Sequence, residues 1–113
     1  MYKNTTINLL GVKYSIKFMD TVLDRDPDGT EISVWGLCNH DKRSIYIATK
    51  NSEMKPRSRD EIRITLIHEI LHAICTSYQY FEASSDESFI EIMARSINSM
   101  INSDLLKRCN IEK

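Results

Sequence analysis

One apolar segment near the middle of the chain limits the possible folds more than any other. Residues 62–74 read Ile-Arg-Ile-Thr-Leu-Ile-His-Glu-Ile-Leu-His-Ala-Ile, which is apolar over most of the circumference of a helix. A helix of this kind is expected to be buried. His68 and His72 are four residues apart, so their imidazoles lie on one face, about one turn from each other. Buried polar side chains need partners, because leaving them unpaired in apolar surroundings is costly.

The same segment contains the pattern His-Glu-x-x-His, with Glu69 directly after the first histidine. This pattern is typical of zinc peptidases, in which two imidazoles bind the metal and the glutamate acts as general base. One metal ion would satisfy His68, Glu69 and His72 together. In the alternative, both histidines bond to backbone carbonyls and Glu69 pairs with Arg63 or another base. The motif and its apolar setting favour the metal.

A catalytic zinc ion usually has three protein ligands and an open fourth position. The metzincin pattern would supply the third ligand from a histidine at position 78, after a glycine at 75, but the chain has Cys75 and Tyr78 there. Glu87 and Glu91 are four residues apart in a predicted later helix and share one face. We expect Glu87 to be the ligand and Glu91 to orient a ligand histidine, with the reverse assignment as the alternative. Acidic residues are also ordinary in the first turns of a helix.

Composition narrows the classes of function. A chain of 113 residues has room for one domain with one modest core, so we expect residues 1–113 to form a single compact domain. The net charge is −1 and no run of Lys or Arg forms a stripe, which disfavours nucleic acid or a membrane as partner. The first ten residues lack the apolar core of a signal peptide, and three widely spaced cysteines do not suggest a disulfide scaffold. We therefore expect a cytoplasmic protein.

The first half of the chain is expected to form strands. Residues 5–10 and 14–19 predict a β-hairpin, because apolar and polar side chains alternate in its second arm. Residues 24–30 predict a turn-rich loop. Residues 32–38 and 44–48 predict a second hairpin.

The second half is expected to form helices. The motif helix should begin at residue 59 or 60 and end near residue 77, with a loop over residues 78–85 and a final helix over residues 86–107. The short loop favours antiparallel packing of the two helices. The predicted fold class is α+β, with a small antiparallel sheet of about four strands packed against the motif helix and a C-terminal glutamate helix.

Three segments of this layout resemble the small gluzincin-type zinc metallopeptidases. They are residues 36–47 (Gly-Leu-Cys-Asn-His-Asp-Lys-Arg-Ser-Ile-Tyr-Ile), residues 65–74 around the motif, and residues 86–94 (Asp-Glu-Ser-Phe-Ile-Glu-Ile-Met-Ala). The resemblance covers about residues 5–101. The similar proteins include the minigluzincins and many phage and prophage proteins with the same motif. The ImmA/IrrE-type peptidases are similar in a wider sense.

The resemblance implies a zincin-like domain with zinc as cofactor and a protein or peptide as substrate. It also implies that the strand at residues 44–48 is the edge strand that holds an extended substrate. The residue roles implied are metal ligands His68, His72 and Glu87, the base Glu69 and the supporting acid Glu91.

We therefore expect an enzyme that hydrolyses peptide bonds, with Glu69 moving the proton. The side chains available to stabilise the developing oxyanion are His40, Tyr46, Tyr78 and Tyr80, although each has an ordinary structural role as alternative. The alternative function is a non-catalytic or latent zinc-binding module that engages a host or regulatory protein. Residues 109–113 could then block the cleft as a plug, or simply form a frayed tail. The sequence predicts no particular oligomeric state.

Overall fold

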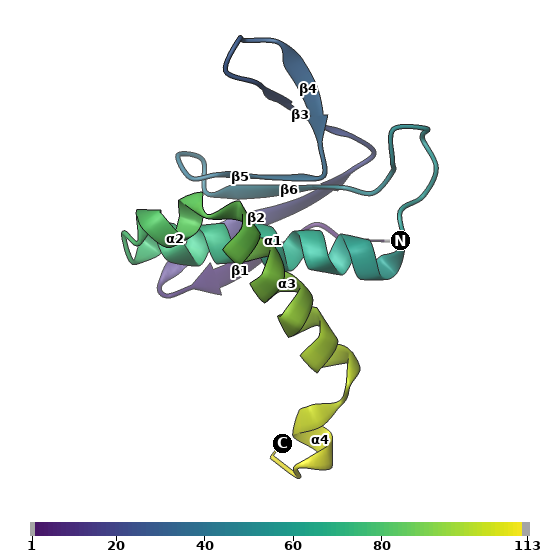
Figure 1. Ribbon diagram of the computed structural model, residues 1–113, viewed down its shortest axis with the longest axis vertical. Helices are drawn as coiled ribbons and strands as arrows, with labels where there is room; N and C mark the ends of the chain where they lie inside the picture. Colours follow the sequence, from purple (N-terminus) through teal and green to yellow (C-terminus); the bar gives the residue numbers. More distant parts are fainter. Residues whose placement is uncertain (1, 112–113) are drawn as a thin grey trace.

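The computed structural model describes residues 2–111, and these residues form an α+β fold with strands first and helices after (Figure 1). This confirms the predicted fold class. The strands are β1 (Thr5–Leu9), β2 (Val12–Met19), β3 (Val22–Arg25), β4 (Glu31–Val34), β5 (Gly36–Asn39) and β6 (Ser44–Ala48). The helices are α1 (Arg59–Ser77), α2 (Phe81–Ser85), α3 (Glu87–Asn102) and α4 (Leu105–Arg108).

The main sheet has four strands in the order β1-β2-β6-β5. The pairs β1–β2 and β5–β6 are antiparallel, but β2 and β6 are parallel, so the sheet is mixed rather than antiparallel throughout. A parallel pair needs a long crossover, which here contains β3, β4 and β5. The strand at residues 44–48 therefore lies inside the sheet. The expectation that it is the edge strand is wrong, and β5 has that position.

The first hairpin confirms the expectation from alternation. Its two-residue turn places Leu10 at φ 55° and Gly11 at φ 84°, the left-handed conformations that a type I′ turn needs. Leu9 pairs with Val12 across this turn. The Asn8 side chain accepts a hydrogen bond from the backbone N–H of Gly11 at 2.9 Å, which supports the turn.

The segment predicted as one strand over residues 32–38 is divided at Trp35. Its first part, β4, pairs with β3 in a separate two-stranded sheet, and its second part, β5, pairs with β6. The strand β3 was not predicted. Most side chains of β3 and β4 are exposed, so they lack the alternation that marks a half-buried strand. This hairpin projects from the main sheet (Figure 1).

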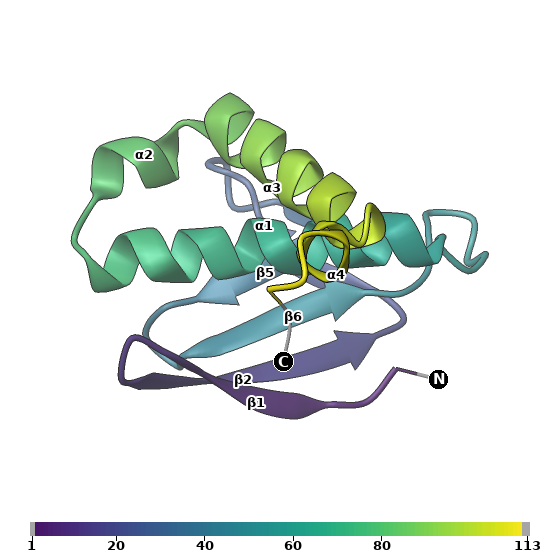
Figure 2. The ribbon, with the colours of Figure 1, turned by 90° about the horizontal axis from the view of Figure 1, so that it is seen from below.

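The motif helix α1 lies on one face of the main sheet, and α3 packs over α1 from the opposite side (Figure 2). It spans the predicted residues and begins with Ser58, whose hydroxyl accepts a hydrogen bond from the Glu61 N–H at 3.1 Å. The main core lies between α1 and the sheet. Its buried members are Leu9, Tyr14, Ile16, Ile45, Ile47, Ile62 and Ala73.

The end of the chain differs from the single long helix that was predicted. A short helix, α2, occupies part of the predicted loop, and the last helix divides where Asp104 adopts φ 58°. In Figure 1, α4 extends away from the sheet and α1, so residues 109–111 lie far from the motif and do not block the cleft, which is the alternative to a frayed tail. Residues 112–113 of that alternative lie outside the described residues. Within residues 2–111, no helix is long and apolar enough to cross a membrane.

Candidate metal centre

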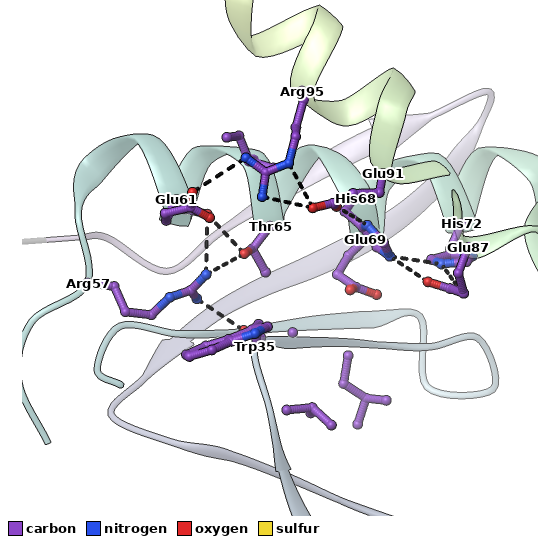
Figure 3. Close-up of a pocket in the computed structure, with 14 residues that line it drawn as sticks. Trp35, Arg57, Glu61, Thr65, His68, Glu69, His72, Glu87, Glu91 and Arg95 are labelled. Atoms are coloured by element: carbon purple, nitrogen blue, oxygen red, sulfur yellow. Dashed lines mark hydrogen bonds and ion pairs between the residues drawn. The ribbon is translucent and has the colours of Figure 1, made fainter. Parts of the chain in front are cut away.

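Two imidazoles from α1 and one carboxylate from α3 converge at the meeting point of these helices (Figure 3). The Nε2 atoms of His68 and His72 lie 3.3 Å apart. Glu87 places Oε2 at 3.0 Å from His68 Nε2 and Oε1 at 3.0 Å from His72 Nε2. The structure thus brings together the three residues predicted as metal ligands.

The other nitrogen of each imidazole has its own partner. His68 Nδ1 lies 3.0 Å from Glu91 Oε1, and His72 Nδ1 lies 2.8 Å from Ser84 Oγ. An ionised carboxylate only accepts hydrogen bonds, so the neutral tautomer of His68 with its proton on Nδ1 is the one that donates to Glu91. In the neutral imidazole this leaves a lone pair on Nε2, which points at the cluster.

A chain of charged side chains holds Glu91 in turn. Arg95 donates from Nε and from Nη2 to Glu91 Oε2, both at 3.0 Å, and its Nη1 lies 3.5 Å from Glu61 Oε1. Arg95 and Glu61 are about half exposed, so their ion pair adds little to stability. The main effect of Arg95 is to fix the direction in which the Glu91 carboxylate faces His68.

Glu69 is the buried acid of the site, with 8% of its surface exposed. Burial raises its pKa to about 7, while His68 opposes the shift and the negative charge of Glu87 adds to it. A carboxyl group with a pKa near neutral can both accept and return a proton. A cation bound by the neighbouring histidines would oppose the shift, because positive charge favours the carboxylate.

Gly36 brings the edge strand β5 close to Glu69. A Cβ at this position would lie 2.7 Å from Thr65 Cγ2, 3.1 Å from Glu69 Cγ and 3.2 Å from Glu69 Oε2. The Thr65 side chain has little freedom to move, since its hydroxyl donates to the Glu61 carbonyl at 2.9 Å and accepts from Arg57 at 2.6 Å. A residue without a side chain is therefore needed where β5 passes α1.

The site opens into a cleft of about 470 Å³. At one end of the cleft lie the imidazoles and Glu87, and at the other lie Trp35 and Arg57, with Glu69 between them (Figure 3). A cleft of this size lies within the range of ordinary ligand sites.

The donor set fits a zinc ion. Two imidazole nitrogens and one carboxylate oxygen are ligands that zinc prefers, and one atom from each residue lies within 4.8 Å of the others. Burial lowers the pKa of His72, although Glu87 opposes this effect, and the neutral imidazole is the form that binds metal. Unprotonated Nε2 atoms and a carboxylate repel one another at 3.0–3.3 Å, so this cluster needs a cation or a shared proton.

Comparison with known proteins adds no family name. No protein-family model, curated protein or solved structure matches this chain. The interpretation of the site therefore depends on the positions and chemistry of its own residues.

The residues considered for the oxyanion lie elsewhere. The residues that line the cleft include none of His40, Tyr46, Tyr78 and Tyr80. His40 lies 3.3 Å from the Thr76 hydroxyl, near the C-terminal end of α1. Tyr46 lies between the core residues Ile45 and Ile47 on β6. Because successive side chains on a strand point to opposite faces, the Tyr46 side chain projects from the face of the sheet that is turned away from α1.

The sequence did not reveal every residue that organises the site. Arg95 follows Glu91 by four residues on one helix, and this spacing could have identified it. Ser84 lies in a segment predicted as a loop, where nothing distinguished it from the adjacent Ser85. The roles of Gly36 and Arg57 depend on how β5 meets α1, which no local pattern indicates.

Proposed function

We propose that this protein is a zinc-dependent metallopeptidase that hydrolyses peptide bonds in a peptide or protein substrate. The observation that carries the proposal is the convergence of His68, His72 and Glu87 beside the buried carboxylate of Glu69, in one open cleft. A purely structural metal site has no need of Glu69. Its place in the cleft, next to the donors but outside the donor group, supports a catalytic role.

Zinc bound by these three side chains would supply Lewis acidity, which polarises a carbonyl and lowers the pKa of water to about 7. Glu69 then accepts a proton from water on its carboxylate and passes it to the leaving amine nitrogen. Glu91 and Ser84 keep the imidazoles oriented by accepting hydrogen bonds from Nδ1.

The strand β5 supports a peptide as substrate. It is at the edge of the main sheet and pairs with β6 on one side only. Gly36 and Leu37 on β5 line the cleft. An extended peptide can add to such an edge through backbone hydrogen bonds. The three free cysteines agree with activity in the reducing cytoplasm.

The test compares purified protein with its Glu69→Gln variant. Wild type should contain about one zinc per chain, measured by atomic emission, and should cleave a mixed peptide library followed by mass spectrometry. Glu69→Gln should keep the zinc and lose about 10²–10⁴-fold in rate, because only the proton carrier is removed. Burial already favours the neutral form of this side chain, so the amide should be tolerated.

Glu82→Gln provides the matched control, since this exposed glutamate lies on α2 outside the donor group. It should keep both zinc and activity. A protein that takes up no zinc would refute the metal site. Zinc uptake with equal cleavage by wild type and Glu69→Gln would refute the mechanism, and zinc uptake without any cleavage by wild type would favour the non-catalytic module.

A further inference from the structure

Trp35 has an unusual position at the far end of the cleft. It is the one tryptophan of the chain, and 57% of its surface is exposed. It occupies the corner where the chain leaves β4 in the small sheet and enters β5 in the main sheet. Its indole ring lines the cleft that contains the candidate metal centre (Figure 3).

Arg57 holds this exposed ring in one place. The Arg57 guanidinium carbon lies 4.5 Å from the centre of the indole ring, in a cation–π stack. The guanidinium also donates to the carbonyls of Trp35 at 3.4 Å and Ala48 at 2.7 Å, and to Thr65 Oγ1 at 2.6 Å. An exposed aromatic ring that is already immobilised can contact a ligand with little further loss of conformational entropy.

The direction of β5 indicates which part of a substrate would reach Trp35. Gly36 lies against Thr65 and Glu69, whereas His40, just beyond β5, contacts Thr76. The strand β5 therefore runs in the same direction as α1. A peptide paired antiparallel to β5, the slightly more stable arrangement, runs the opposite way and directs its C-terminal part toward Trp35.

We propose that Trp35 determines specificity by selecting substrates with a large apolar or aromatic side chain on the C-terminal side of the scissile bond. Among the residues that line the cleft, Val34, Leu37 and Ile64 supply apolar side chains alongside the Trp35 ring. Arg57 acts as a positioning residue, because it holds the ring through the stack and the hydrogen bonds described above. This inference rests on the proposed function, since the scissile bond is defined by the candidate metal centre.

The test uses zinc-loaded protein and two peptide hydroxamates, which bind zinc and need no turnover. The two probes are identical except for a benzyl or a methyl side chain on the residue that follows the hydroxamate. Calorimetry should show the benzyl probe binding wild type about tenfold more tightly than the methyl probe. Trp35→Ala should remove most of this difference, and Trp35→Phe should keep most of it. The emission of Trp35 should change when the benzyl probe binds to wild type.

Leu106→Ala is the matched control, because Leu106 is also 57% exposed but lies on α4 and does not line the cleft. It should leave the preference for the benzyl probe unchanged. Equal affinity for the two probes in wild type, or the same preference in Trp35→Ala, would overturn this inference while the proposed function stands. A failure to take up zinc would overturn the proposed function and this inference with it.

Discussion

The two candidate ligand histidines are oriented by partners of different kinds. His68 donates to the carboxylate of Glu91, which Arg95 holds in place, while His72 contacts the neutral hydroxyl of Ser84. A charged acceptor makes an imidazole a stronger donor to metal than a neutral acceptor does. We therefore expect His68 to be held more firmly toward the metal position than His72.

At the scale of single residues, Ser84→Ala should weaken zinc binding about 10–100-fold, because His72 loses the partner that fixes its ring. Competition with a chromophoric zinc chelator measures the affinity. Ser85→Ala is the matched control, since the Ser85 hydroxyl donates to the Glu82 carbonyl within α2 and does not contact His72. Equal affinities for the two variants would show that Ser84 does not orient the imidazole.

Gly36→Ala should destabilise the fold by about 1–3 kcal/mol, because its new methyl group would come within 2.7 Å of Thr65 Cγ2. The free energy of unfolding in urea measures the loss. Adding Thr65→Ser removes Cγ2 and keeps the hydroxyl that contacts Arg57, so the double variant should recover part of the stability. A Gly36→Ala protein as stable as wild type would contradict the close approach of β5 to α1.

At the scale of elements, α1 serves both packing and chemistry. Ile62 and Ala73 face the sheet in the core, whereas His68 and His72 face α3. Glu69 faces β5 and Gly36. One helix can do all three because its residues project in different directions around the axis. Movement of α1 would therefore disturb the core and the candidate site together.

Ser58 marks where α1 begins, so Ser58→Ala should cost about 1 kcal/mol of stability through loss of the hydrogen bond from the Glu61 N–H. Thermal unfolding should shift by roughly 4 °C for a domain of this size. Ser52→Ala in the exposed loop before α1 is the control and should change little. If Ser52→Ala lowered the Tm as much as Ser58→Ala, the hydrogen bond from the Glu61 N–H to Ser58 would not be the cause of the loss.

At the scale of the whole molecule, the candidate metal centre connects two helices that are distant in the chain. His68 and His72 come from α1 and Glu87 comes from α3, so a bound ion would link them. Beyond this region α3 continues past the body of the molecule and α4 makes few contacts with other elements (Figure 1). A bound metal ion would thus hold the N-terminal half of α3, which carries Glu87, against α1.

Zinc should stabilise the folded protein, because the assembled donor group exists only in the native state. At a free zinc concentration of about 100 times Kd, the gain should be about 2.7 kcal/mol, which corresponds to roughly 10 °C in Tm. Differential scanning fluorimetry with zinc and then with a chelator measures this gain. The double variant His68→Ala/His72→Ala should show no gain, and an equal gain in that variant would place the effect elsewhere.

Local patterns predicted the elements whose signals repeat within a few residues. The first hairpin, the extent of α1 and the shared face of Glu87 and Glu91 follow from alternation and helical spacing. The strand β3, the division at Trp35 and the parallel pairing of β2 with β6 did not follow. The strand β3 has mostly exposed side chains and therefore gives no alternation, whereas the pairing of β2 with β6 joins segments far apart in the chain and leaves no periodic trace.

By itself the sequence determined which side chains can share a helix face, because the pitch of a helix converts a spacing of four residues into proximity. That was sufficient to pair His68 with His72 and Glu87 with Glu91, while the His-Glu-x-x-His pattern selected Glu69. The tertiary structure alone decided that Glu87 meets both Nε2 atoms while Glu91 and Ser84 take the Nδ1 atoms. The crossing of α3 over α1 sets these distances, and packing between separate elements, rather than local spacing, controls that crossing.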